Sequence, residues 1–164
     1  MKRVCVVLVA TALLMFGTVS QAAEDDVAGI VNKSNPAGSL AMTQLQKILL
    51  GPRPKWSSGM NITVLMTKPG QPERSATIKI VCAMSETDFM LHFVRSWRKH
   101  DGSSNADSGD APTVISSAVE LLRLVASTPN AIGFIKASQV DDSVKVVAID
   151  GSLPGEAAYK LRPK

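Results

Sequence analysis

The chain has 164 residues, of which 45% are hydrophobic and only 4% are aromatic. This is enough apolar material for one domain whose core is made mostly of aliphatic side chains. The formal net charge is +4. The sequence shows no concentrated basic patch of the kind that binds nucleic acid, apart from the cluster Arg95–His100, which we interpret as the polar end of a helix.

Residues 1–22 have the layout of a secretory signal peptide. Two basic residues precede an apolar run, Val4–Phe16, and small or polar residues follow it. The run is short for a bilayer span, although a retained membrane helix is the alternative. We expect cleavage after Ala22 or Ala23 and a periplasmic mature protein. Cleavage removes both basic residues and no acid, which lowers the net charge from +4 to +2.

The reactive residue types are few and do not form a recognisable site. Cleavage leaves Cys82 as the only cysteine, and its apolar neighbours predict a small buried side chain. His92 and His100 are accompanied by no cysteine or carboxylate set at metal-ligand spacing. No Ser–His–Asp arrangement and no Gly-x-Ser-x-Gly motif is found. We therefore expect no metal, no cofactor and no catalytic activity.

Apolar runs and helical periodicities alternate along residues 24–150, the predicted domain. Strands alternating with helices favour an α/β fold, a three-layer lobe with a mixed, mostly parallel sheet. A glycine at position 133, inside a predicted strand, indicates close approach of another backbone. Residues 151–164 are interpreted as a polar C-terminal tail. Strands are expected at 27–31, 62–66, 113–115, 131–135 and 143–150, and helices at 40–50, 74–81, 85–98 and after Ser116 or Ser117.

The segment between the second strand and the following helix has the form of an anion-binding loop. A strand leads into a turn rich in proline and glycine, and a helix is expected from Arg74. The free N–H groups and the positive dipole end of such a helix point to one place. In the alternative interpretation the turn is solvated, Glu73 caps the helix dipole, and Arg74 turns outward to pair with Glu73. The candidate anion ligands are Lys68, Gly70, Arg74 and Ser75.

A second group of candidates follows the first strand. Asn32, Lys33 and Ser34 come after its carboxyl end, and ligands of open α/β sheets gather at such ends. We include Asn32 and Ser34 among the candidate ligands, with a plain turn stabilised by asparagine and proline as the alternative. Ser116 and Ser117 could also donate to an anion, but helix capping explains them equally well.

The order of these segments resembles that of the periplasmic phosphate-binding proteins of ABC transporters. The run Ile30–Pro36, the helix Leu45–Gly51, Trp56 and the strand Ile62–Leu65 follow one another as they do in that family, and Ala131–Phe134 resembles its Ala-Ile-Gly-Tyr strand. The resemblance covers nearly the whole predicted domain. It implies a type 2 periplasmic-binding-protein fold, phosphate or a related oxyanion as ligand, and no catalytic activity.

The chain departs from that family in two ways. The family carries Ser-Gly-Thr-Arg at the helix start, whereas this sequence has Gln71, Pro72, Glu73 and Arg74, so two hydroxyls are lost and a carboxylate is gained. The match also covers one lobe of a two-lobed clamp. We therefore expect an exported solute-binding-type domain. The alternative is a ligand-free protein-interaction module of the cell envelope, with an envelope protein or a second copy of the chain as partner.

Overall fold

A computed structural model gives the fold of the chain and describes residues 25–52, 54–99 and 111–163. The predicted signal peptide at residues 1–22 lies outside these ranges. Within them, no helix combines the length and the apolar character that crossing a membrane requires.

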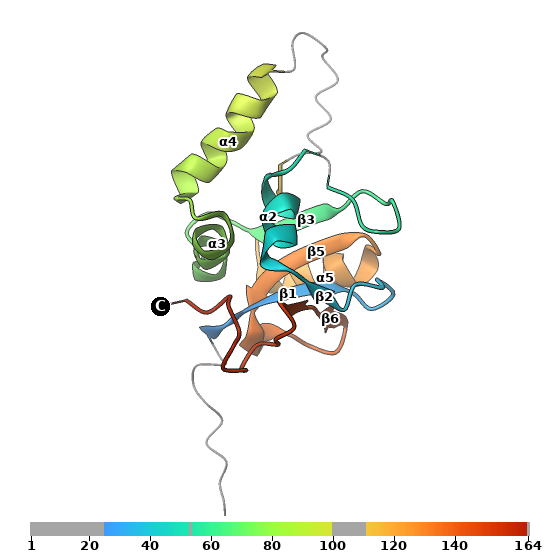
Figure 1. Ribbon diagram of the computed structural model, residues 1–164. Helices are drawn as coiled ribbons and strands as arrows, with labels where there is room; N and C mark the ends of the chain where they lie inside the picture. Colours follow the sequence, from blue (N-terminus) through green and yellow to red (C-terminus); the bar gives the residue numbers. More distant parts are fainter. Residues whose placement is uncertain (1–24, 53, 100–110, 164) are drawn as a thin grey trace, which may run out of the picture.

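A five-stranded sheet with the order β4-β3-β5-β1-β6 forms the centre of the fold (Figure 1). β3 pairs in parallel with β4 and β5, whereas β1 pairs antiparallel with β5 and β6. Four strands therefore point the same way and β1 alone is reversed, which confirms the predicted mixed, mostly parallel sheet. The strands are β1 (Val27–Asn32), β3 (Thr63–Thr67), β4 (Thr113–Ile115), β5 (Ala131–Lys136) and β6 (Val144–Val146).

Helices cover both faces of this sheet. Alternate side chains of β1 point to opposite faces, so Val27 and Val31 pack in one apolar cluster while Ala28 and Ile30 pack in another. The cluster containing Val27 also holds side chains of α2, α4 and a π-helical segment, and the other holds those of α5. The predicted three layers are thus confirmed. The helices are α2 (Met42–Leu50), α3 (Pro72–Thr77), the π-helix η1 (Ile78–Cys82), α4 (Glu86–Lys99), α5 (Ala118–Ser127) and the 3₁₀ turn η2 (Ala137–Gln139).

Close contact between α5 and the sheet depends on Gly133 in β5. A Cβ at this position would lie 2.5 Å from Leu121 Cδ2 and 3.1 Å from Val125 Cγ2. The absence of a side chain therefore lets α5 lie directly on the strand, which confirms the close approach predicted from the sequence.

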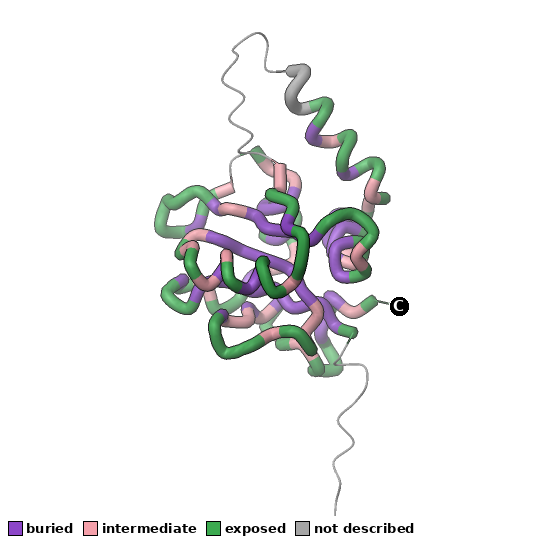
Figure 2. Tube along the Cα trace, turned by 180° about the vertical axis from the view of Figure 1, so that it is seen from behind, coloured by how far each residue is buried: buried purple, intermediate pink, exposed green. Residues whose placement is uncertain are grey.

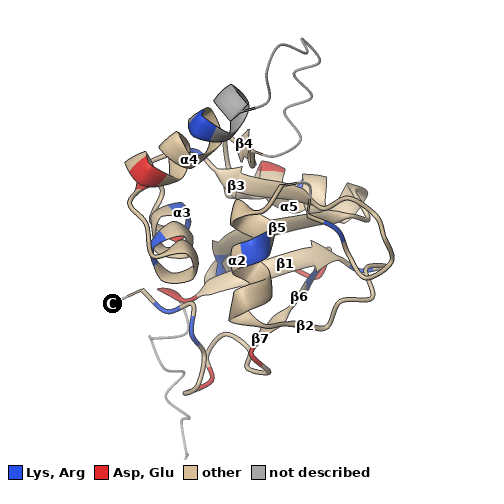
Figure 3. Ribbon diagram, turned by 45° about the horizontal axis from the view of Figure 1, so that its top comes forward, with Lys and Arg blue, Asp and Glu red and all other residues tan. Residues whose placement is uncertain are grey.

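α4 is the least embedded helix of the described chain. It extends away from the sheet in Figure 1, and Figure 2 shows that it is mostly exposed while the central strands are buried. Ser85 caps its first turn, since Ser85 Oγ accepts a hydrogen bond from the N–H of Asp88 at 3.1 Å. Acidic residues lie at its start and Arg95 toward its end (Figure 3), an order that suits the helix dipole.

The predicted strand at 143–150 is wrong as a single element. It is divided into β6, which pairs with β1, and β7 (Ala148–Ile149), which pairs in parallel with β2 (Ser39–Leu40). Between them, the N–H of Val147 donates to Gly29 O at 2.9 Å. Alternate side chains point to opposite faces along the whole segment. This pattern shows which face of a sheet a residue occupies, but it does not show which strand pairs with that residue.

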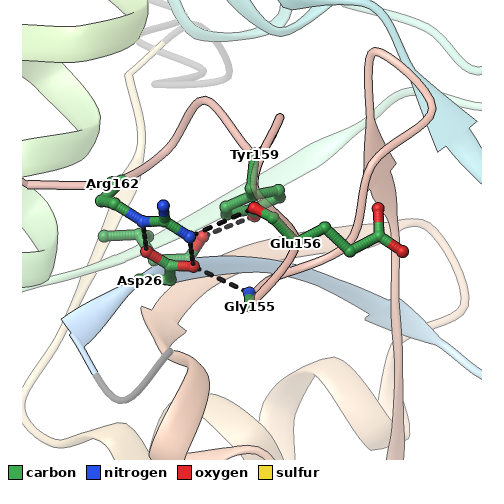
Figure 4. A network of polar contacts seen from close by, with 6 residues as sticks. Asp26, Gly155, Glu156, Tyr159 and Arg162 are labelled. Atoms are coloured by element: carbon green, nitrogen blue, oxygen red, sulfur yellow. Dashed lines mark hydrogen bonds and ion pairs between the residues drawn. The ribbon is translucent and has the colours of Figure 1, made fainter. Parts of the chain in front are cut away.

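The last residues of the described chain pack onto the first strand. Tyr159 and Leu161 are buried in the main apolar cluster, and the N–H of Val27 donates to Leu161 O at 2.9 Å. Figure 4 shows Asp26 at the centre of this attachment, where its fully buried carboxylate pairs with Arg162 and accepts a hydrogen bond from the N–H of Gly155. Segment 151–163 therefore belongs to the packed fold, although its sequence is that of a polar tail.

Tyr159 should make the protein sensitive to alkaline pH. Its hydroxyl donates to Val27 O at 2.6 Å, and burial, with the nearby Asp26 charge, raises the pKa of Tyr159 above its ordinary value of 10.0. Because the folded-state pKa is raised, the stability linked to it is complete below pH 10.0 and is lost as the pH rises toward the folded value. We expect the tyrosine to ionise only as the protein unfolds.

Ultraviolet absorbance of tyrosinate measures this directly, because Tyr159 is the only tyrosine in the chain. Its rise should coincide with the loss of circular dichroism. In Tyr159→Phe, neutral-pH stability should fall by about 1 kcal/mol from the lost hydrogen bond, while alkaline unfolding becomes less steep. A tyrosinate midpoint near 10.0 in the folded protein would contradict this.

Candidate functional site

A polar pocket lies at the edge of the sheet where three strands end. β3, β4 and β5 are mutually parallel, so their carboxyl ends meet there, as in the ligand sites of open α/β sheets. The pocket has a volume of about 350 Å³. Its lining residues are Thr67, Lys68, Gln71, Pro72, Glu73, Ser116, Ser117, Ala118, Lys136 and Gln139.

The predicted anion loop contributes one of its four candidates to this pocket, Lys68. Gly70 has a φ of 89°, in the region that favours glycine, and the N–H of Gln71 closes the turn on Lys68 O at 3.3 Å. Gly70 and Ser75 are exposed and lie outside the pocket lining. The turn therefore has the expected shape, and it places Lys68 at the pocket.

Arg74, the second predicted cation of the loop, lies in the protein interior with 2% of its surface exposed. Its Nε and Nη2 contact Glu86 Oε1 at 2.9 and 2.8 Å, and its Nη1 donates to Thr67 O at 3.0 Å. The guanidinium also lies 5.9 Å from the centre of the Phe89 ring. Arg74 thus fastens the end of β3 to the start of α4, and its partner is Glu86 and not Glu73.

The helix after the loop is too short for its dipole to contribute much to anion binding. α3 has six residues and continues as the five-residue π-helix η1, which ends at Ala83 in the left-handed conformation. Pro72 occupies its first turn and supplies no N–H group. The side chains around the pocket therefore have to provide most of any ligand contact.

Two buried polar side chains of the pocket have no partner within the described chain. Thr67 is 2% exposed and its Oγ1 makes no hydrogen bond. Glu73 is 5% exposed and lines the pocket. Its main-chain carbonyl accepts a hydrogen bond from the Thr77 hydroxyl, but its carboxylate makes no hydrogen bond or ion pair to any described residue. Buried polar groups are nearly always satisfied in folded proteins. The Glu73 carboxylate therefore faces the place where a ligand would satisfy it, whereas the Thr67 hydroxyl is covered by protein atoms.

The other side of the pocket comes from the ends of β4 and β5. Ser116 and Ser117 follow β4, and Ser117 Oγ accepts a hydrogen bond from the N–H of Glu120 at 3.2 Å, which confirms the predicted cap of α5. A hydroxyl that accepts this bond can still donate its own hydrogen. Lys136, the last residue of β5, lines the pocket and forms no ion pair within the described residues.

Asn32 and Ser34 lie at the opposite edge of the sheet, away from the pocket. β1 is reversed, and its register places Val27 beside Lys136, so its carboxyl end lies far from the carboxyl end of β5. The Asn32 amide donates to Val125 O at 3.1 Å and Ala126 O at 2.6 Å. Its Oδ1 accepts from the N–H and hydroxyl of Ser34. Asn32 therefore caps the end of α5 and Ser34 is hydrogen-bonded to Asn32, and neither residue lies at the loop.

The remaining reactive groups lie outside the pocket. Cys82 is buried, as predicted, and burial raises the pKa of its thiol to about 12. A thiol with such a pKa is protonated at neutral pH and is a poor nucleophile. Across the described ranges, no group of three or more His, Cys, Asp or Glu side chains could hold a metal ion.

No protein-family model and no curated protein matches the sequence, but solved structures resemble the fold. A phosphate ABC transporter substrate-binding protein from Clostridium perfringens, solved with bound phosphate, superposes with a TM-score of 0.60 at 26% identity over 79% of this chain and 47% of its own. An ABC-type phosphate transport receptor from Vibrio cholerae gives 0.61 at 23% identity over 79% and 48%.

PstS from Borrelia burgdorferi gives a TM-score of 0.56 at 13% identity, over 79% of this chain and 49% of its own. The chain thus spans about half the length of each of these structures. The predicted type 2 periplasmic-binding-protein-like fold is confirmed, and the chain shares it with substrate-binding proteins of phosphate ABC transporters.

Proposed function

We propose that the chain is an exported, non-catalytic solute-binding domain that holds a small anion, such as phosphate, in the pocket at the ends of β3, β4 and β5. The observation that carries the proposal is the presence of two cations, Lys68 and Lys136, and two exposed serine hydroxyls, Ser116 and Ser117, around one pocket. Ammonium and hydroxyl groups are suitable donors to an oxyanion. The fold shared with a protein solved with bound phosphate supports the same conclusion.

Each residue has a defined role in this proposal. Lys68 and Lys136 supply positive charge, and Ser116 and Ser117 supply hydroxyl donors. Gly70 shapes the turn that carries Lys68, Ser75 lies in α3 after it, and Arg74 holds the end of β3 from the interior. The signal-peptide layout of residues 1–22 supports a periplasmic location.

Calorimetric titration of the purified protein with phosphate and sulfate at low salt tests this function. We expect measurable binding at millimolar or lower anion concentration. Lys68→Gln and Lys136→Gln should each weaken phosphate binding by about tenfold, because each removes a charge-assisted contact. Lys79→Gln is the matched control, since Lys79 is exposed on η1 and outside the pocket. Absence of heat with both anions would refute the proposal.

A protein-interaction role is the second candidate, and α4 is the observation that favours it. Met90, Leu91 and Val94 form an exposed apolar stripe on this protruding helix, with 47%, 39% and 39% of their surfaces exposed. Such a stripe suits an envelope protein or a second copy of the chain. In this case Met90→Ser with Val94→Ser should abolish retention of the partner, or dimerisation measured by light scattering, whether or not phosphate is present.

A further inference from the structure

The carboxylate of Glu73 is the feature of the pocket that a simple oxyanion does not explain. It lies beside two lysines in a site suited to an anion, and it would repel a fully deprotonated ligand. We propose that the natural ligand is a small zwitterion, whose anionic group contacts Lys68 and Lys136 and whose ammonium contacts Glu73. This inference rests on the proposed function, because it specifies the ligand class of the same pocket.

Among the described residues, no cation forms an ion pair with Glu73. The nearest arginine in the sequence, Arg74, is committed to Glu86 and to the Thr67 carbonyl. The two lysines of the pocket form no ion pair with Glu73 in the structure. A buried carboxylate without a counter-charge is costly, and a ligand ammonium would remove that cost on binding.

Unpaired groups of both signs of charge therefore line one pocket. Two ammonium groups require an anion, and one carboxylate, 5% exposed, requires a donor or a cation. A sulfate ion satisfies the first requirement and has no hydrogen to offer the second. Hydrogen phosphate offers one hydrogen, whereas an ammonium group offers three and a full positive charge.

The size of the pocket agrees with a ligand larger than a bare oxyanion. A volume of 350 Å³ falls within the usual range for small-molecule sites. A tetrahedral oxyanion replaces only a few waters, each of which occupies about 30 Å³ in the liquid. The side-chain amides of Gln71 and Gln139 at the same site can orient the part of the ligand that joins the two charged groups.

Two phosphonates that differ only in an amine provide the test. The wild-type protein is titrated calorimetrically with ethylphosphonate, with 2-aminoethylphosphonate and with inorganic phosphate. We expect about tenfold tighter binding of the amino compound than of ethylphosphonate, the gain typical of one charge-assisted contact. Glu73→Gln should reduce this preference to about twofold or less, while its affinity for ethylphosphonate stays the same or rises because the repulsion is gone.

Glu120→Gln is the matched control. Glu120 is exposed, lies three residues after Ser117 and does not line the pocket, so its loss changes the same charge nearby without touching the ligand. This variant should keep the full preference for the amine. Loss of the preference in both variants would show that the effect comes from net charge and would overturn the inference.

The remaining outcomes separate the inference from the function on which it rests. If wild type binds phosphate and both phosphonates equally well, the ligand needs no ammonium and the inference fails while the proposed function stands. If none of the three probes binds, both fail. If Glu73→Gln leaves ligand preference unchanged and alters the oligomeric state, Glu73 faces a second protein and the zwitterion is excluded. The comparison of probes on wild type decides the question even if Glu73→Gln does not fold.

Discussion

Replacing Asp26 with alanine is expected to lower the free energy of unfolding by about 3 kcal/mol. The carboxylate is fully buried and accepts hydrogen bonds from Arg162 Nε at 2.8 Å, Arg162 Nη2 at 3.1 Å and the N–H of Gly155 at 2.8 Å. Its removal leaves these donors facing a site from which water is largely excluded. Urea denaturation followed by circular dichroism measures the loss.

The neighbouring residue provides the control for this variant. Asp25 is exposed, so Asp25→Ala should change stability by no more than about 0.5 kcal/mol. Asp26→Ala should also detach the C-terminal segment, which limited trypsin digestion at Lys160 would detect as faster cleavage. Equal stability of the two alanine variants would show that the Asp26 contacts do not hold the segment in place.

Arg74→Met is the second substitution with a large expected effect, again about 3 kcal/mol. It removes a guanidinium that is 2% exposed and leaves Glu86, with 29% of its side chain exposed, without its counter-charge. The Thr67 carbonyl loses a donor as well. Thermal and urea unfolding should both report the destabilisation, and α4 should be the first helix to become accessible to protease.

A double-mutant cycle separates the ion pair from packing. Replacing a buried ion pair as a whole is less costly than removing one partner, so Arg74→Met combined with Glu86→Gln should be more stable than Arg74→Met alone. Phosphate affinity of the folded Arg74→Met protein should stay within about twofold of wild type, because Arg74 lies outside the pocket. A tenfold loss of affinity would restore Arg74 as a direct ligand.

The sequence was sufficient to predict those helices and strands that local sequence signals determine. Short apolar runs predicted β1, β3, β4 and β5. Ser85 marked one helix start and the pair Ser116 and Ser117 another, of which Ser117 is the cap. The predicted helix at 40–50 begins instead at Met42, because Leu40 pairs with Ile149 in the small sheet. Such a pairing joins residues distant in the chain, and no local pattern contains it.

The site was predicted less completely for the same physical reason. Lys68 follows its strand directly and could be identified, whereas Lys136 enters the pocket only because β5 lies beside β3. The burial of Arg74 depends on Glu86, twelve residues later, which turns a predicted surface cation into an interior one. Asn32 was grouped with the loop because a strand's sequence does not show its direction, and β1 alone is reversed.

The reversed strand also constrains the order in which the chain can fold. β1 is formed by the first described residues, yet both strands that flank it, β5 and β6, come from the last third of the sequence. Its first N–H group is satisfied by Leu161, close to the end of the described chain. The middle of the sheet can therefore close only after residues 131–161 are available. Pairings of such large sequence separation slow folding, so β1 of the newly made chain should remain unpaired until these residues have been added.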